Sequence, residues 1–216
     1  MTKPRVHILL GAPGSGKGTA AKQIVQEFGL SHLSTGDILR DAVSKGTEVG
    51  LRAKAIMAAG KLVDDSTVNS LVFARLQEET GDVLFDGYPR TREQAESLEE
   101  FLSLQGIELG LVMEIDVPQD VLEARVVGRR VCSNSACGAI FHLSSLPPQR
   151  EGVCDKCSSP LKHRADDTSD AFRSRMAEFN QTYRPVKAFY QGKPNFHQVD
   201  GNRPPVPVFH DLAKLF

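Results

Sequence analysis

The chain lacks a strong excess of either charge and any long apolar run, and both absences narrow its possible functions. Its 216 residues carry a formal net charge of -1. Proteins that bind nucleic acids or membrane surfaces generally rely on a strong basic excess, so we expect neither partner. No apolar stretch approaches the length needed to cross a bilayer, and only a short one follows Lys3 and Arg5. We therefore expect no secretory leader and a cytoplasmic location.

Repeats and low-complexity tracts are also missing, and cysteine is scarce. The four cysteines all lie between residues 132 and 157. The apolar and charged fractions, 40% and 25%, are those of an ordinary globular protein. Nothing indicates an extended coiled coil or an obligate interface. We expect one main domain with insertions, and a monomer.

The most informative stretch that is present is a glycine-rich run, residues 11–19, directly after the apolar segment Val6–Leu10. It reads Gly-Ala-Pro-Gly-Ser-Gly-Lys-Gly-Thr and is called the phosphate loop below. Glycines let a backbone approach phosphate closely, and Lys17 adds a charge for the β and γ phosphates. A helix predicted to begin near Gly16 would point its N-terminal amides at the same anion. This context predicts a nucleoside triphosphate site.

The phosphate loop departs from the usual G-x-x-x-x-G-K-[ST] pattern at one position. Gly18 follows the lysine, and the hydroxyl comes one residue later, at Thr19. This shift weakens the case for direct magnesium ligation by the hydroxyl. The alternative is a glycine-rich connection that binds nothing, and the preceding strand, the following helix and the position of Lys17 argue against it.

Short apolar runs alternate with longer helical patterns, which predicts an α/β fold with a parallel sheet covered by helices on both faces. The predicted strands are Arg5–Leu10, Ser31–Ser34, Val83–Asp86, Leu111–Val117 and Asn195–Val199. The predicted helices include Ser66–Glu79, Arg92–Gln105, Gln119–Val127 and Ser169–Tyr190. We assign residues 1–33, 64–127 and 168–216 to this core. Ligands bind beyond the carboxyl ends of such strands, so residues 11–19 and 86–90 should meet at one crevice.

Two segments are predicted to be inserted into the core. Residues 34–63 contain two short helical patterns, with Gly46 and Gly60 as stops. Residues 128–167 have little helical periodicity, many turn residues and all four cysteines.

The cysteines form two pairs, a C-x4-C at Cys132 and Cys137 and a C-x-x-C at Cys154 and Cys157. Two such knuckles predict a zinc ribbon with a closed, structural site, although the first spacing is at the long end of the usual range. A disulfide framework is one alternative, disfavoured in a cytosolic protein. Another recruits His142 or His163 as the fourth ligand. Thiolate sites also accept iron and cobalt, so the spacing leaves the metal open.

Basic side chains follow the strand predicted at Val83–Asp86 and flank the cysteine segment. Arg90 is a candidate for a second phosphate, and Asp86 for organising Mg²⁺ through its water shell. Arg125 and Arg129 precede the cysteines, and Arg164 and Arg175 follow them. A guanidinium suits phosphate oxygens, but each arginine alone could equally lie on a solvated face.

Taken in order, these motifs closely resemble those of adenylate kinases of the long form, with a cysteine-bearing lid. The resemblance rests on residues 11–19, Ser34–Arg40, Asp86–Arg90, Gly128–Arg130 and Arg164–Asp167, and covers almost the whole chain. The C-x4-C knuckle departs from the more usual C-x2-C, which puts the metal geometry in doubt but not the kinase assignment. The resemblance implies a P-loop core, a helical AMP-binding insertion at 34–63 and a lid at 128–167.

The resemblance also implies the substrates ATP, AMP and ADP, with Mg²⁺ accompanying ATP, and the reaction ATP + AMP ⇌ 2 ADP. It assigns ATP to Gly14, Ser15, Gly16, Lys17, Gly18, Thr19, Arg129, Ile140, Phe141 and Gln198. It assigns AMP to Thr35, Arg40, Lys61, Leu62, Val63, Gly87, Tyr88, Pro89, Arg90, Gln94, Arg164 and Arg175. The groups expected around the transferred phosphoryl are Lys17, Arg90, Arg125, Arg129, Arg164 and Arg175. Both insertions would close over the substrates and exclude water.

Three rival functions remain. The nearest is a kinase for another nucleoside monophosphate, or one that uses GTP as donor. The second is a zinc-ribbon binding module whose phosphate loop serves as a nucleotide switch. It would bind a nucleotide without multiple turnover, and it gives residues 86–90 no role. A structural protein with a disulfide leaves the arginines unexplained.

Overall fold

The computed structural model describes residues 4–216 and is built on a five-stranded parallel sheet. Residues 1–3, including Lys3, lie outside the described residues. The strands are β1 (Arg5–Gly11), β2 (Ser31–Ser34), β3 (Val83–Asp86), β4 (Glu108–Asp116) and β8 (Phe196–Asp200). They lie in the order β2-β3-β1-β4-β8, and every neighbouring pair is parallel. The predicted fold class is confirmed, and all five strands lie close to their predicted positions.

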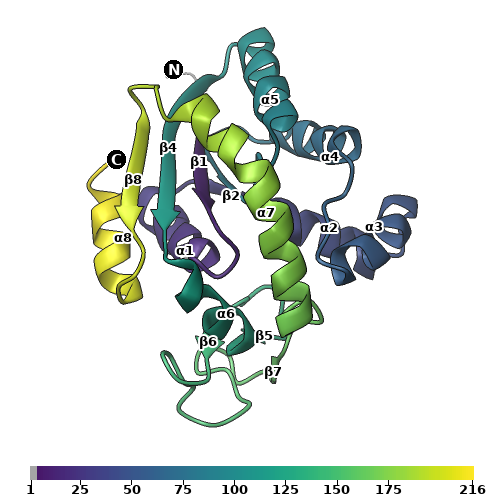
Figure 1. The fold of residues 1–216 in the computed structure, drawn as a ribbon, viewed down its shortest axis with the longest axis vertical. Helices are drawn as coiled ribbons and strands as arrows, with labels where there is room; N and C mark the ends of the chain where they lie inside the picture. Colours follow the sequence, from purple (N-terminus) through teal and green to yellow (C-terminus); the bar gives the residue numbers. More distant parts are fainter. Residues whose placement is uncertain (1–3) are drawn as a thin grey trace.

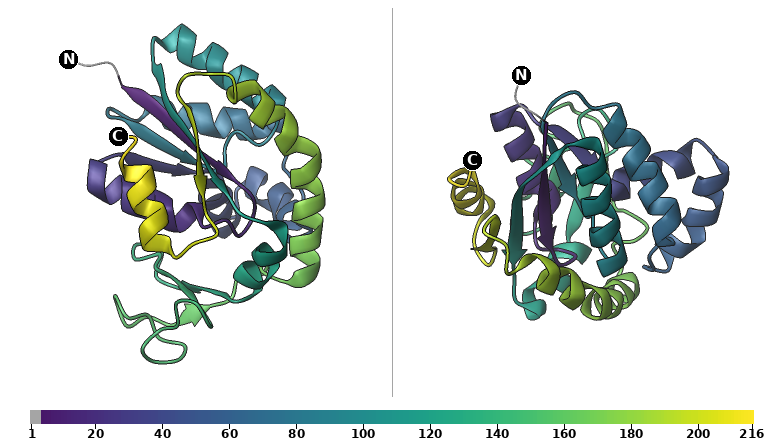
Figure 2. Two further views of the ribbon diagram at one scale, coloured as in Figure 1. Left: turned by 60° about the vertical axis from the view of Figure 1, so that its left-hand side comes forward. Right: turned by 90° about the horizontal axis from the view of Figure 1, so that it is seen from above.

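Helices cover both faces of the sheet, because successive residues of a buried strand point to opposite sides. In β1, Ile8 packs into one apolar cluster, and Leu9 packs into the other. The first cluster includes α4 (Asp65–Gln77) and α5 (Arg92–Gln105), and the second includes α1 (Lys17–Phe28), α6 (Gln119–Val127) and α8 (Pro205–Ala213). Figure 2 shows these helices on the two sides of the strands.

The long helix α7 (Ser169–Tyr190) runs from the lid back along the core (Figure 1). Its N-terminal half contributes Phe172 and Met176 to one cluster, and its C-terminal half contributes Val186 and Tyr190 to the other. The helix therefore joins both apolar layers, and its first turns leave the lid directly.

The two insertions project from the core at different places (Figure 1). The first contains α2 (Thr35–Ser44) and α3 (Glu48–Ala58), which pack against each other as expected. Gly46 and Gly60 follow these helices in the left-handed region, with φ of +64° and +72°. The lid contains β5 (Arg129–Cys132), β6 (Ile140–His142) and β7 (Leu161–Lys162) in an antiparallel sheet that we did not predict.

Helix α8 was also missed from the sequence. Its segment carries Pro204, Pro205 and Pro207, which reads as a loop. Proline is tolerated in the first turn of a helix, where its missing N–H costs no internal hydrogen bond. Val208 and Leu212 then pack into the cluster that contains α1. Within residues 4–216, none of the helices combines the length and apolar character that a membrane span requires.

Candidate active site and metal centre

Loops from the carboxyl ends of three neighbouring strands line one large cleft. The phosphate loop follows β1, the start of α2 follows β2, and residues 86–90 follow β3. The lid also lines the cleft, with residues from its three strands β5, β6 and β7. The predicted meeting of residues 11–19 and 86–90 at one crevice is confirmed.

The phosphate loop has a backbone that only glycine accommodates at its turns. Gly11 and Gly14 have φ of +143° and +88°. A Cβ on Gly11 would lie 2.6 Å from the Ile115 carbonyl oxygen, and one on Gly14 would lie 2.8 Å from that of Leu122. A side chain at either position would therefore clash with backbone atoms, whose displacement would cost considerable energy.

Lys17 begins α1, directly after its N-cap Gly16, and reaches back across the loop. Its Nζ donates hydrogen bonds to the carbonyl oxygens of Gly11, at 2.6 Å, and Ala12, at 2.8 Å. Burial, opposed by Asp86 and assisted by nearby arginines, lowers the pKa of Lys17 to about 7. A phosphate group at this position would stabilise the charged lysine, as a buried cation requires an anion.

Asp86 is the last residue of β3, and its negative charge acts on Lys17. His32 Nε2 lies 3.7 Å from its Oδ2. Burial acts to raise the pKa of Asp86, but His32, Lys17 and Arg90 together hold it below its ordinary value. The group is therefore ionised at neutral pH, as a carboxylate that orders the water shell of Mg²⁺ must be.

Several of the predicted arginines form ion pairs or hydrogen bonds within the cleft. Arg129 makes a two-pronged contact with the fully buried Asp167. Arg175 Nη1 lies 3.2 Å from Asp166 Oδ2, and Arg90 Nε donates to the Gly87 carbonyl at 2.6 Å. Burial lowers the pKa of Arg175, and likewise of Arg164, to about 10. So many desolvated guanidinium groups in one cleft favour a ligand with several negative charges.

The Arg129–Asp167 pair predicts a large effect on stability. Arg129→Met should lower the free energy of unfolding by about 3 to 5 kcal/mol, because it leaves the Asp167 carboxylate buried without its main cation. The measurement is urea unfolding. The control is Arg173→Met, whose partner Asp170 is 3.7 Å away and where both side chains are exposed. That surface pair should contribute less than about 1 kcal/mol. Equal losses in the two variants would contradict the prediction.

A smaller pocket lies between the helical insertion and the core. Most of the residues predicted for AMP line it: Thr35, Arg40, Lys61, Leu62, Val63, Gly87, Arg90, Gln94 and Arg175. Leu39, Met57 and Val68 add apolar walls that the sequence did not single out. The pocket thus combines apolar side chains with arginines, as a nucleoside monophosphate requires.

The remaining predicted residues lie in several places. Ile140, Phe141, Arg125, Arg164 and Pro89 line the large cleft. Arg125 donates to the Gly201 carbonyl at 3.0 Å. Tyr88 is fully buried, and its hydroxyl donates to Asn69 Oδ1 at 2.6 Å. Gln198 is exposed on β8 and donates to Asp116 Oδ2 at 3.0 Å. Neither the Tyr88 nor the Gln198 side chain lines the cleft or the pocket.

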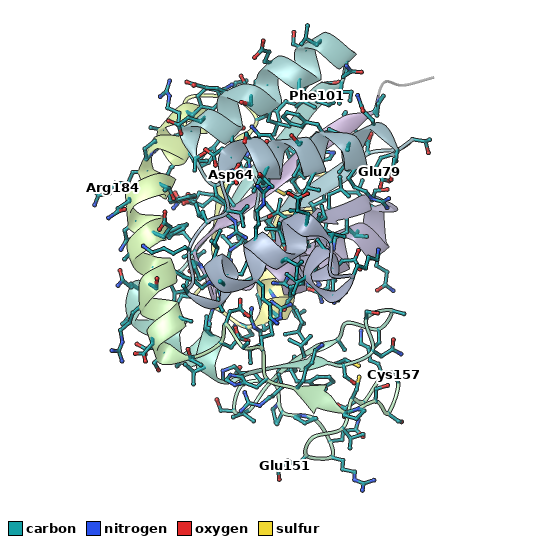
Figure 3. The ribbon with its side chains drawn as sticks, turned by 90° about the vertical axis from the view of Figure 1, so that its right-hand side faces the viewer. Asp64, Glu79, Phe101, Glu151, Cys157 and Arg184 are labelled. Atoms are coloured by element: carbon teal, nitrogen blue, oxygen red, sulfur yellow. The ribbon has the colours of Figure 1, made fainter. Side chains whose placement is uncertain are left out.

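The sulfur atoms of the four cysteines converge at the end of the lid sheet, where all lie within 4.8 Å of one another. The Sγ atoms of Cys132 and Cys157 are 3.4 Å apart, and those of Cys137 and Cys154 are 3.7 Å apart. A tetrahedron with metal–sulfur bonds of about 2.3 Å has edges of about 3.8 Å. The four thiols therefore fit a closed, tetrahedral metal site. Figure 3 shows Cys157 in the lid, with Glu151 at its outer end.

The alternatives for the cysteines fit less well. All four are free thiols, so the disulfide framework is wrong for this structure. His142 Nε2 lies 3.0 Å from the Ala124 carbonyl, and its Nδ1 accepts from the backbone of Ser144 and Ser145. Among residues 4–216, the metal-competent cluster contains neither His142 nor His163. The long C-x4-C knuckle closes because the Asn134 carbonyl accepts from both Cys137 N and Gly138 N.

A family model described as adenylate kinase matches residues 9–195. The chain belongs to the adenylate kinase family. It is 46% identical over 197 residues to an adenylate kinase of Allorhizobium ampelinum, with 90% of each chain covered. It is 41% identical over 209 residues to one of Thermoanaerobacter sp., which covers 96% of this chain and 95% of the relative. An adenylate kinase of Thermococcus kodakarensis is 38% identical over 208 residues, covering 96% and 92%.

One part of this adenylate kinase cleft escaped the sequence prediction. Gly201, Asn202, Arg203 and Pro204 also line it. They follow β8 directly, so the rule that located residues 86–90 applies to them as well. They were missed because these four residues match none of the phosphate-binding motifs used to predict the site.

Proposed function

We propose that this protein catalyses the reversible transfer of the terminal phosphoryl group of ATP to AMP, giving two ADP. One observation carries the proposal: Arg90 and Arg175 line both the large cleft and the smaller pocket. Two phosphate-binding spaces that share arginines suit a donor and an acceptor whose phosphate chains meet. A single nucleotide site would leave the second space unexplained.

In this proposal the residues of the phosphate loop from Gly14 to Thr19 hold the ATP phosphates, with Arg129, and Ile140 and Phe141 flank its adenine. Gln198, whose side chain is exposed, would contact the adenine of ATP through its backbone. The pocket holds AMP through Thr35, Arg40, Lys61–Val63, Gly87, Arg90 and Gln94, with Tyr88 and Pro89 supporting the loop between Gly87 and Arg90. Residues 34–63 and 128–167 act as separate covers on a core of 1–33, 64–127 and 168–216.

The chemistry needs charge stabilisation and no nucleophilic side chain, because phosphoryl transfer passes through a loose transition state with charge on the equatorial oxygens. Lys17, Arg90, Arg125, Arg129, Arg164 and Arg175 supply that charge and hold donor and acceptor in line. Mg²⁺ bound with ATP would supply further charge neutralisation, and Asp86 would order its water ligands. Closure of both covers excludes water as a competing acceptor, and reopening limits turnover.

We further propose that the lid metal is Zn²⁺, with iron or cobalt as alternatives, held by Cys132, Cys137, Cys154 and Cys157. Closed tetrahedral thiolate sites are structural and do not take part in chemistry. The protein is proposed to act as a monomer in the cytoplasm. It is also proposed to bind neither nucleic acids nor membranes, and the formal net charge of -1 supports this second point.

A coupled assay of ADP formation tests the proposed function. The purified protein is expected to make ADP from mixed ATP, AMP and Mg²⁺ over many turnovers, and to do so poorly with GTP as donor or with other nucleoside monophosphates. Nucleotide binding without multiple turnover would overturn the kinase and favour the nucleotide switch. Preference for another monophosphate would change only the acceptor.

A further inference from the structure

The side-chain amide of Gln94 is held in place before any ligand is considered. Gln94 lies in the first turn of α5, is 2% exposed, and lines the smaller pocket. Its Oε1 accepts a hydrogen bond from the backbone N–H of Arg90 at 2.7 Å. Its Nε2 donates to Asp65 Oδ1, also at 2.7 Å. Both ends of the amide therefore have a fixed protein partner.

The chemistry of the two partners determines which end of the amide is which. A backbone N–H can only donate, so it must face the oxygen. An ionised carboxylate can only accept, so it must face the nitrogen. Reversing the amide would set an N–H against the Arg90 N–H and an oxygen against the Asp65 carboxylate. Each contact would leave buried polar groups unpaired, which is costly.

Asp65 is itself held in position by a second hydrogen bond. It is the first residue of α4, and its Oδ2 accepts from the Thr91 hydroxyl at 2.6 Å. Thr91 is the N-cap of α5, and its hydroxyl accepts from the backbone N–H of Gln94. The carboxylate thus links the starts of α4 and α5 and cannot turn away without breaking both contacts.

We propose that Asp65 is a positioning residue that sets the base preference of the acceptor pocket by fixing the direction of the Gln94 amide. This inference rests on the proposed function and names its selectivity determinant. A Gln amide has two donors and two acceptor sites, so one N–H and one lone pair remain for a ligand. Their order is fixed, so they match a base with an amino donor at C6 beside an N1 acceptor. A 6-oxopurine presents the reverse order and needs the reversed amide.

The test compares AMP with IMP, which differs from it only in carrying a 6-oxo group and an N1–H. The variant is Asp65→Asn, whose amide can either accept from or donate to Gln94. The Arg90 N–H still favours the original direction of the Gln94 amide in this variant, so we expect the ratio of kcat/KM for AMP to that for IMP to fall by about three- to tenfold. The change should come from a higher KM for AMP and a lower KM for IMP, while the KM for ATP stays constant.

The matched control is Asp64→Asn, the same change at the neighbouring residue. Asp64, labelled in Figure 3, is exposed, caps α4 by accepting from Thr67 N at 2.9 Å, and forms no hydrogen bond with Gln94. Asparagine caps helices about as well as aspartate, so the control should fold and keep the wild-type ratio within about twofold. An unchanged ratio in Asp65→Asn, or an equal change in both variants, would overturn the proposal.

A measurement on the wild-type protein covers the case in which Asp65→Asn does not fold. In NMR spectra of glutamine-labelled protein, assigned with Gln94→Glu, one Gln94 side-chain proton should exchange slowly with solvent. Rapid exchange of both protons would overturn the proposal. If the wild type makes no ADP, the proposed function fails separately, and calorimetric binding of AMP and IMP then tests the base preference without turnover.

Discussion

Lys17→Met is expected to lower kcat by several hundredfold while the protein stays folded. The lysine is half-buried at the start of α1, beside the loop that would hold the ATP phosphates. Removing one preorganised cation from such a site costs about 3 to 4 kcal/mol of transition-state stabilisation. Methionine occupies a similar volume and relieves the protein of a buried charge, so the melting temperature should change little.

Steady-state kinetics with ATP and AMP, together with thermal unfolding, measure this effect. Arg90→Ala should show a loss of the same order, since Arg90 lines both nucleotide spaces. The control is Lys45→Met, whose exposed side chain pairs with Asp41 at 2.6 Å on the surface of α2. It should keep wild-type turnover. Near wild-type kinetics in a folded Lys17 or Arg90 variant would refute their assigned roles.

Cys154→Ser is expected to lower the melting temperature and the metal content far more than turnover at low temperature. Cys154 is buried, and the apolar cluster of the lid contains only a few residues besides the cysteines. A bound metal would therefore replace the missing core, since structural zinc supplies on the order of 10 kcal/mol of apparent folding free energy. The cysteines take no part in the proposed charge stabilisation, so a lid that stays folded at low temperature should still close.

Elemental analysis, calorimetry and kinetics on the same samples separate these effects. Lys156→Ser is the matched control: it changes an exposed residue between the two cysteines of the second knuckle and should keep its metal. A wild-type protein that contains no metal and melts at the same temperature as Cys154→Ser would contradict the structural role. The elemental analysis also identifies the metal.

Patterns local to the chain predicted most of the fold. Alternating apolar runs located the five strands, and the glycines at positions 46 and 60 located the ends of both helices in the insertion. The same reasoning missed α8, because its prolines suit a loop and a first helical turn equally well. It missed the lid strands because each is only a few residues long, and their pairing joins distant parts of the lid.

Residue type and short spacing were enough to identify the phosphate loop, the arginines, the four cysteines and the family. How these groups face one another depends on the folded chain. In the structure Tyr88 packs into the core, and Arg129 pairs with Asp167. His142 and His163 lie outside the cysteine cluster. Asp65 accepts a hydrogen bond from Gln94. Those contacts join residues that are far apart in the chain, and packing of whole helices and strands, which no local pattern records, brings them together.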